Sequence, residues 1–261
     1  MLKGRLLTRA IRIRVYPCSS VDWKPEMQNT IDLLDAHYAC QLGCTPEDLN
    51  SDRLIVVPNE NVAGIRFAKG IPMAVYALSK HNGAVVCLLP HLAEPARKAI
   101  AARSPSGLDD ALCDTLQRAL DPFIHVRFWF RGFRLYCEPA SFIDQSFGEV
   151  RDVADQDVSA RHMRDTWGGP VFGQIVDGKA VTWCAIKPLS ETVWDLSIET
   201  RPEYRGRGCA KSTVSAAVKH CFENGRLVGW GCDRDNPASL RTALSVGFKH
   251  YALDFGCEEV V

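Results

Sequence analysis

Short runs of apolar residues between turn-forming residues predict a mixture of strands and helices in the first half of the chain. Apolar positions in residues 30–41 recur at helical spacing, whereas other runs show the β-branched and aromatic clustering of strands. The pattern predicts helices at 30–41, 90–102 and 108–120 and strands at 53–57, 73–78 and 84–89. Two further runs, 124–130 and 133–137, flank Arg131 and Gly132, which predicts a hairpin that turns at those two residues.

The second half of the chain has a more regular pattern. It predicts strands at 149–153, 171–176, 181–186, 193–200 and 227–232, helices at 157–166, 211–222 and 235–247, and a last strand from residue 248. The fold class is therefore α/β, with a mixed sheet. We place a domain boundary in the polar stretch after Pro139, between a mixed α/β domain at 1–145 and a second domain at 146–261.

The predicted strand at 193–200 leads into a glycine-rich loop and then into a helix. The run is Ile198-Glu-Thr-Arg-Pro-Glu-Tyr-Arg-Gly-Arg-Gly-Cys-Ala210, and its glycines allow a sharp turn and a close approach of the backbone to a ligand. The N–H groups in the first turn of a helix have no partner within the helix, and they lie at the positive end of its macrodipole. This order of elements predicts a site for an anionic ligand that carries a pyrophosphate.

Composition and charge restrict the classes of protein to consider. The chain has 261 residues, of which 46% are hydrophobic, with 31 basic and 31 acidic residues. Equal numbers of charges argue against a nucleic-acid binder, which usually has a basic excess. Arg9, Arg12 and Arg14 interrupt any signal-peptide core, and no run approaches the roughly 20 apolar residues that span a bilayer. We expect a cytoplasmic protein that binds neither nucleic acid nor membrane.

Eleven cysteines are scattered along the chain without a Cys-x-x-Cys pair. Zinc sites built from cysteine show paired ligands, so no metal is expected. Most of the cysteines lie in apolar runs, where a thiol behaves as a small hydrophobic side chain. We therefore expect buried, reduced thiols, as in a reducing cytoplasm.

The first half shows no arrangement of residue types that points to a particular chemistry. His91 and Glu94 share a helical face, but a metal site needs a third ligand. For the aromatic run Phe128, Trp129 and Phe130, both core packing and pocket lining remain open. This half either shapes a substrate pocket or forms a dimer contact.

Two motifs in the second half resemble those of the GNAT superfamily of N-acetyltransferases. Arg205-Gly-Arg-Gly-Cys-Ala210 is similar to the acyl-CoA binding motif, Arg/Gln-x-x-Gly-x-Gly/Ala. Asn236-Pro-Ala-Ser239, followed by Val246-Gly-Phe248, resembles the second motif of the superfamily. The resemblance covers about residues 147–255. Within the superfamily it is greatest to two-part bacterial acetyltransferases with an extra N-terminal domain, a group that includes antibiotic self-resistance enzymes.

The resemblance implies acetyl-CoA as the cofactor and a set of contacts with it. The pyrophosphate is expected on the backbone amides of Arg205, Gly206, Arg207, Gly208, Cys209, Ala210 and Lys211. Backbone groups of Ile198 and Thr200 are expected to pair with the pantetheine arm, and an N–H near Glu199 and Thr200 to stabilise the oxyanion. Asn236 is expected to contact the pantetheine, with Ser239 near the cofactor or the loop.

The implied chemistry is direct transfer, in which an amine attacks the thioester while a base removes its proton. Glu199 is the first candidate for that base, because this strand end lies beside the thioester in the superfamily; a surface carboxylate paired with an arginine is the other interpretation. Asp195 and Asp233 are further candidates. Many members use a tyrosine four residues before the Gly of Gly-Phe as general acid, but this chain has Ala243 there. Two alternatives are open: Tyr251 on the following strand as a substitute, or departure of the thiolate that relies on water or on the low pKa of the thiol itself.

Together, these residues predict an acetyl-CoA-dependent N-acetyltransferase for a small-molecule amine, with antibiotics and other secondary metabolites among the acceptors. A homodimer is the default assembly. Because Ala243 replaces the tyrosine, the alternative is a catalytically degenerate acyl-CoA-binding module that senses or regulates. A nucleotide-binding protein is disfavoured, because the loop lacks the Lys-Ser/Thr ending of a Walker motif.

Overall fold

A computed structural model describes residues 29–64, 72–101, 103 and 107–259. The interrupted apolar stretch near the N-terminus and Cys18 lie outside them. The helices are α1 (Thr30–Leu42), α2 (Pro46–Leu49), α3 (Ala93–Ile100), α4 (Asp110–Leu120), α5 (Val158–Trp167), α6 (Cys209–Glu223) and α7 (Pro237–Ser245). Short 3-10 turns occur at Glu60–Gly64, Pro90–Leu92, Asp121–Phe123 and Pro202–Tyr204.

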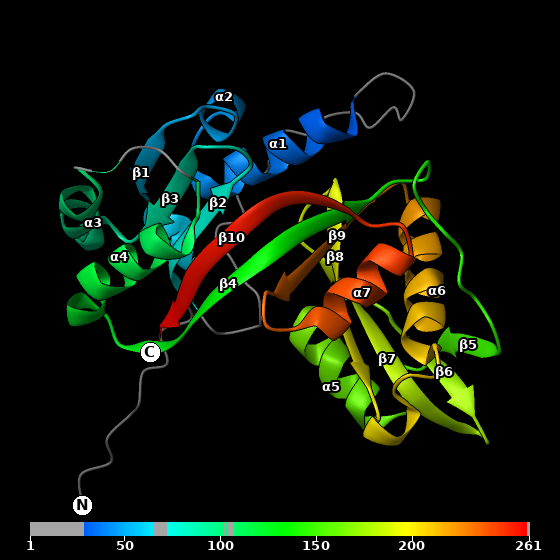
Figure 1. Cartoon of the computed structure of the whole chain (residues 1–261). Coiled ribbons are helices and arrows are strands. Elements are labelled where there is room, and N and C mark those ends of the chain that lie inside the picture. The colour runs from blue at the N-terminus through cyan, green and yellow to red at the C-terminus, as the bar shows by residue number, and fades with distance from the viewer. Residues whose placement is uncertain (1–28, 65–71, 102, 104–106, 260–261) are drawn as a thin grey trace, which may run out of the picture.

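The strands form one mixed sheet, which confirms the predicted α/β fold class. They are β1 (Leu54–Pro58), β2 (Met73–Ser79), β3 (Ala84–Leu88), β4 (Val126–Cys137), β5 (Glu149–Asp152), β6 (Val171–Val176), β7 (Lys179–Pro188), β8 (Val193–Thr200), β9 (Leu227–Asp233) and β10 (Lys249–Glu259). The ten strands lie in the order β1-β3-β2-β10-β4-β9-β8-β7-β6-β5 (Figure 1). The pairs β1/β3 and β8/β9 are parallel, and the other neighbours are antiparallel.

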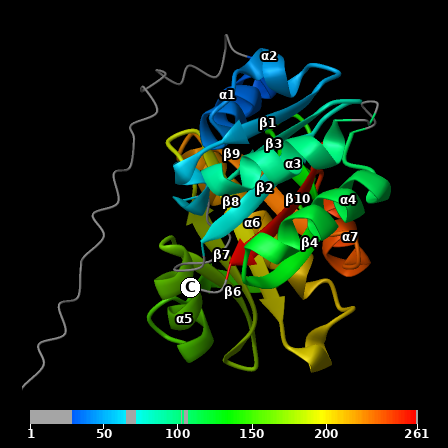
Figure 2. The same cartoon turned by 90° about the vertical axis from the view of Figure 1, so that its left-hand side faces the viewer.

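Helices cover both faces of this sheet. Successive residues of a strand point to opposite faces, so Leu135 of β4 packs with α6 and α7 while Tyr136 packs with α1. In the same way, Cys184 of β7 packs with α6 and Trp183 packs with α5. Figure 2 shows α1 and α5 on one side of the molecule and α4 and α7 on the other.

The predicted hairpin at Arg131 and Gly132 is wrong, because β4 runs straight through both residues. Gly132 pairs with Asp233 of β9 on one side and with Asp254 of β10 on the other. A Cβ atom at this position would lie 2.7 Å from the carbonyl oxygen of Cys232 and even closer to the Asp254 carboxylate. The glycine therefore marks a close approach of neighbouring strands, and not a turn.

The sheet is continuous across the two halves of the chain. Strand β4 comes from the first half and lies between β9 and β10 from the second half. The predicted boundary between residues 145 and 146 falls in the connection from β4 to β5, and it stays a prediction.

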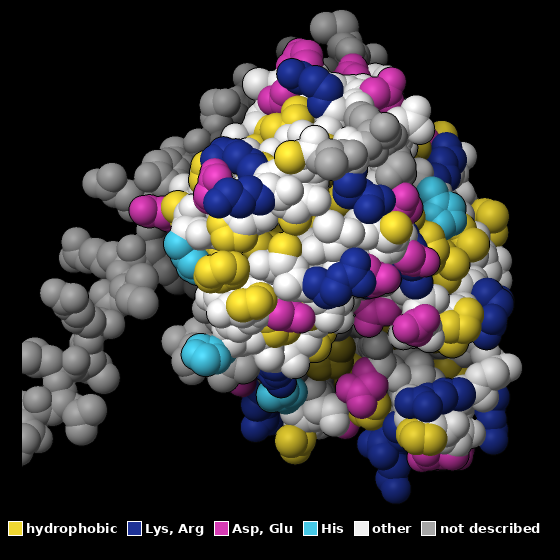
Figure 3. All heavy atoms as spheres, turned by 60° about the vertical axis from the view of Figure 1, so that its left-hand side comes forward, with side chains coloured by type: hydrophobic (Ala, Val, Ile, Leu, Met, Phe, Trp, Pro, Cys, Tyr) yellow, Lys and Arg dark blue, Asp and Glu magenta, His cyan; other side chains and the backbone are white. Residues whose placement is uncertain are grey.

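The structure also shows the state of the cysteines and the mixture of charges on the surface. The described cysteines are free thiols, and most of them are buried. On the face that Figure 3 draws, basic and acidic side chains are interspersed. Among the helices of the described ranges, none is long and apolar enough to cross a membrane.

Candidate active site

Strands β8 and β9 separate in the middle of the sheet. Their parallel pairing runs only from Val193↔Leu227 to Asp195↔Gly229. Beyond this point β8 still pairs with β7 as far as Thr200, and β9 still pairs with β4 as far as Asp233. The two strands therefore turn unpaired backbone edges toward each other, and an extended chain with amide groups can pair with such an edge.

The glycine loop follows the free end of β8. Gly206 and Gly208 have φ values of 75° and 84°, in the left-handed region that favours glycine. Gly208 is the N-cap of α6 and has no side-chain cap, and the helical hydrogen bonds begin with the Ser212 N–H on the Gly208 carbonyl at 3.2 Å. The N–H groups of residues 209–211 thus precede the ladder and are available to an anion.

Nearby side chains brace this loop. Arg205 Nε donates to the Thr200 carbonyl at 3.3 Å, and the Arg207 guanidinium lies 5.2 Å from the centre of the Tyr204 ring. Behind the loop, the buried Ser212 hydroxyl donates to the Phe147 carbonyl at 2.7 Å and accepts from the Phe147 N–H at 3.0 Å. These contacts tie the segment before β5 to α6 and so hold the start of the helix in place.

A cavity of about 290 Å³ lies beside the point where β8 and β9 separate. Residues of β4, β7, β8, β9, β10 and the start of α7 line it. Its ionisable side chains are Arg134, Lys187, Asp195, Asp233, Asp254 and Glu258. Four carboxylates against two cations make the cavity acidic, although the whole chain is neutral.

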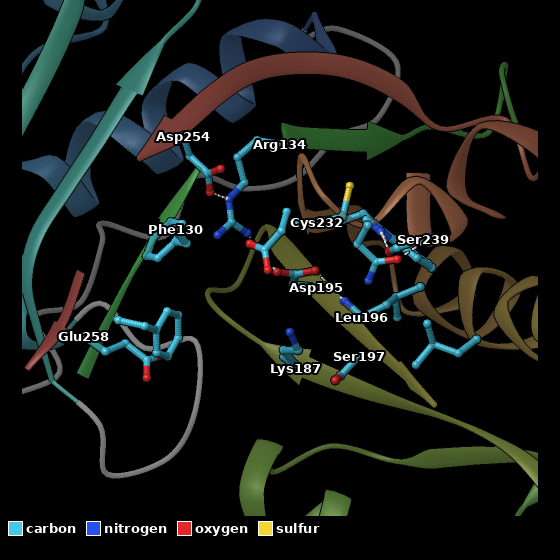
Figure 4. Close-up of a pocket in the computed structure, with 16 residues that line it drawn as sticks. Phe130, Arg134, Lys187, Asp195, Leu196, Ser197, Cys232, Ser239, Asp254 and Glu258 are labelled. Carbon is cyan, nitrogen blue, oxygen red and sulfur yellow. Dashed lines mark hydrogen bonds and ion pairs between the residues drawn. The ribbon is translucent and has the colours of Figure 1, made fainter. Parts of the chain in front are cut away.

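Arg134 holds two of these carboxylates in a buried cluster (Figure 4). Its Nε donates to Asp254 Oδ2 at 2.7 Å, and its Nη1 donates to Asp195 Oδ2 at 3.2 Å. Asp195 Oδ1 also accepts from the Leu196 N–H at 2.7 Å. A Cβ atom at Gly231 of β9 would lie 2.6 Å from Arg134 Nη1, so the glycine leaves space for the guanidinium. This cluster fixes the floor of the cavity.

Lys187 of β7 stands on the other side of Asp195. Burial lowers the pKa of Lys187, and the negative charge of Asp195 opposes that effect. Its ammonium group lies 4.3 Å from the centre of the Trp167 ring at the end of α5. Figure 4 shows Lys187 and Ser197 below the Arg134 cluster.

The structure brings some of the predicted site residues into this cavity and leaves others outside. Asp195, Ile198, Asn236 and Ser239 line it. Asn236 Oδ1 caps α7 by accepting from the Ser239 N–H at 3.1 Å, and Ser239 Oγ accepts from Trp230 Nε1 at 3.1 Å. Glu199, Thr200 and the loop residues 205–211 are not part of the lining, and Glu199 is exposed.

Asp233 is one of two carboxylates of the cavity that stand apart from the Arg134 cluster, and Glu258 of β10 is the other. Asp233 ends β9, and no described side chain forms a hydrogen bond or an ion pair with its carboxylate. Partial burial and the nearby charge of Asp235 raise the pKa of Asp233, whereas Arg134 opposes the shift. A carboxylate with a raised pKa and no partner is available to accept a proton.

Neither position considered for a general acid lies at the cavity. Ala243 is fully buried between α7 and the sheet. The Tyr251 hydroxyl donates to Asp35 Oδ1 at 2.7 Å, and its ring stacks on Tyr38 with centroids 5.0 Å apart. Tyr251 thus belongs to the packing of α1, and its position does not support a role as substitute acid.

Several residues of the cavity were not found by sequence reasoning. Arg134 lies between Phe133 and Leu135, and Lys187 directly follows the mostly apolar residues 180–186, and a charge beside such residues is a signal for burial. Of the aromatic run in β4, Phe128 and Phe130 line the cavity, while Trp129 stacks on Phe255 with centroids 5.0 Å apart. Neighbouring residues of a strand point to opposite faces of the sheet, so the same run both lines the cavity and packs in the core.

Comparison with known proteins agrees with the motifs of the second half. Residues 174–252 match a family described as GNAT acetyltransferase. The chain is similar to an uncharacterised N-acetyltransferase, YdfB, of Bacillus subtilis (strain 168), with 32% identity over 78 residues. This match spans 30% of the present chain and only 30% of the length of that relative.

Solved structures with a similar arrangement include three acetyltransferases. A GNAT family acetyltransferase from Colwellia psychrerythraea has 13% identity and a TM-score of 0.47, covering 87% of this chain and 97% of that one. A putative one from Novosphingobium aromaticivorans has 18% identity and a TM-score of 0.44, covering 54% and 69%. The putative acetyltransferase yncA of Salmonella typhimurium, solved with acetyl-CoA, has 18% identity and a TM-score of 0.31, covering 39% and 68%.

The matched segment contains the separated strands β8 and β9 and the glycine loop before α6. Through this segment the chain is similar to the GNAT acetyltransferases.

Proposed function

We propose that this protein transfers an acyl group, with acetyl-CoA as donor, to the amine of a small molecule. The observation that supports this most directly is the gap between β8 and β9, which connects the glycine loop at one end with an acidic cavity at the other. A cytoplasmic location and a homodimer remain predictions from the sequence.

The loop and the separated strands fit the donor. The N–H groups of residues 209–211 and the positive end of α6 suit a pyrophosphate, with Arg205 and Arg207 exposed beside them. The free edge of β8 around Ile198 suits the amides of a pantetheine arm. When bound, acyl-CoA supplies an activated thioester carbonyl.

The acidic cavity fits an amine acceptor. An amine reaches the protein mostly as an ammonium ion, which carboxylates attract, and it must lose a proton before it can act as a nucleophile. We assign that proton to Asp233, because this carboxylate has a raised pKa, has no partner among the described residues and ends β9, one of the two separated strands. Glu258 shares the first two properties but lies on β10, away from the gap. Asp195 is occupied by Arg134, and Glu199 is exposed outside the lining.

A direct test follows the release of free thiol from acetyl-CoA in the presence of a panel of primary amines. Release above background with at least one amine, together with formation of the acetylated amine, is the expected result. Tight CoA binding without release for any amine would instead support a module that senses acyl-CoA without turning it over.

The pH dependence of kcat/KM is expected to identify the base. A carboxyl group must be ionised to accept a proton, so activity should fall as pH drops through the pKa of Asp233, which lies above its ordinary value of 3.8. Asp233→Asn should lower kcat/KM roughly 100-fold or more and abolish this acidic limb.

Two further variants make this test specific. Asp235→Asn should shift the acidic limb to lower pH, because the charge of Asp235 helps to raise the pKa of Asp233. Glu199→Gln should leave the profile close to that of the parent. A large loss for Glu199→Gln with a normal profile for Asp233→Asn would assign the base to Glu199.

A further inference from the structure

Glu258 of β10 is a buried carboxylate in the wall of the cavity. Its relative exposure is 5%, and among the described residues no group forms a hydrogen bond or an ion pair with it. Burial raises the pKa of Glu258, and the exposed Arg127 opposes this only from a distance. Proteins seldom bury a carboxylate without a partner, because an unpaired charge loses its hydration.

Two phenylalanines of β4 stand beside this carboxylate. Phe128 pairs with Glu258 across the strands, and the rings of Phe128 and Phe130 lie 6.4 Å apart with 58° between their planes. Both rings line the cavity, and Phe128 is 44% exposed although it is large and apolar. Aromatic faces together with a carboxylate form a site that suits an organic cation.

This second group of residues lies apart from the position that we assign to the reacting amine. On β4, Phe128 faces Glu258 and Gly132 faces Asp233, so the two acidic positions are offset by four residues, roughly 13 Å along a strand. They also flank β4 on opposite sides, which adds two strand spacings, or roughly 10 Å. Figure 4 shows Glu258 and Phe130 at the end of the cavity away from Ser239.

We propose that the acceptor carries two positive groups, of which one reacts near Asp233 and the other binds against Glu258, Phe128 and Phe130. This inference rests on the proposed acyl transfer, and it names the class of acceptor as a flexible diamine or polyamine. The excess of two carboxylates over cations in the lining matches two positive charges. The backbone positions of Asp233 and Glu258 are more than about 10 Å apart, but both carboxylates extend from their strands into the cavity between them. The two nitrogen atoms of the acceptor are therefore expected on the order of 10 Å apart.

The test is a series of linear α,ω-diamines and polyamines of increasing length, each compared with the monoamine of equal length. The kcat/KM ratio of diamine to monoamine should peak for nitrogen atoms about 10 Å apart and reach about 30 there, because only that length serves both carboxylates. A ratio near one at every length would overturn the proposal.

Glu258→Gln keeps the shape of the side chain and removes its charge. It should reduce the diamine to monoamine ratio at least about tenfold through KM, while the exposed Glu60→Gln, which does not line the cavity, should not change it. An unchanged ratio in Glu258→Gln would contradict the assignment. The midpoint of urea unfolding should be at least that of the parent, because the substitution removes an unpaired buried charge.

A binding measurement separates failure of this inference from failure of the proposed transfer. Calorimetry measures the affinity of the full chain, with CoA present, for a linear diamine whose nitrogen atoms are about 10 Å apart. Glu258→Gln should weaken this affinity at least about tenfold. If no amine releases thiol but this difference is present, the cation site stands and the transfer does not. If thiol is released but the diamine binds both proteins equally, the transfer stands and the second cation site is rejected.

Discussion

Arg134→Leu is expected to lower the free energy of unfolding by about 3–5 kcal/mol, because it leaves two buried carboxylates without their cation. The Arg134, Asp195 and Asp254 side chains are each only 4% exposed, so water can compensate little for the lost guanidinium. Urea unfolding at pH 8 measures the loss. Arg151→Leu, at an exposed ion pair, is the control and should change stability by less than about 1 kcal/mol.

The size of this loss should depend on pH. Burial raises the folded-state pKa of Asp254 above its ordinary value, and Arg134 opposes this, so the pKa should rise further in the variant. A group of this kind stabilises the fold below its unfolded pKa and loses that contribution as pH rises through its folded pKa. The deficit of Arg134→Leu should therefore be larger at pH 8 than at pH 4.5.

A triple variant tests the same explanation. Arg134→Leu combined with Asp195→Asn and Asp254→Asn has no unpaired charge, so it should recover a large part of the loss and most of its pH dependence. An equal deficit at both pH values, or no recovery in the triple variant, would show that the cost of Arg134→Leu comes from lost packing.

Gly208→Asp is expected to weaken CoA binding on the order of 100-fold, about 2.7 kcal/mol. The new carboxylate would occupy the N-cap of α6, accept from the free N–H groups of the first turn and repel the pyrophosphate. Calorimetry with CoA measures the change. The loss should be smaller at high salt, because screening weakens the repulsion.

Gly208→Asn is the matched control for this prediction. Asparagine and aspartate have nearly the same shape and both tolerate positive φ better than other residues, so they share the strain and the contact with the Phe147 ring. Gly178→Asn, at φ 73° in a hairpin with open space around it, should leave CoA binding unchanged. Equal affinities of the Asp and Asn variants at residue 208 would exclude an anion site at this helix start.

Local sequence signals were sufficient for most of the elements and for the loop. Asp177 and Gly178 adopt positive φ between β6 and β7, as expected for a two-residue turn. Gly132 shows the limit of such signals, because a glycine between apolar runs is equally compatible with a turn and with closely spaced strands. Which of the two applies depends on β9 and β10, whose positions are not encoded near residue 132.

The candidate site was only partly predictable for the same reason. Ile198, Asn236 and Ser239 were found because they lie within recognisable motifs, and they line the cavity. Glu199 lies in the same motif but is exposed, since the direction of a side chain depends on strand register. Glu258 lies in no motif, and only its position in the sheet makes it a candidate.

The sequence by itself determined the glycine loop before α6, because the φ preference of glycine and the unpaired N–H groups of a helix start are local properties. Only the tertiary structure decided which charged side chains line the cavity. Arg134 and Asp254 meet across 120 positions of sequence, in neighbouring strands β4 and β10. The order and register of strands in a sheet are set by long-range packing, so no local pattern specifies which charges will face one another.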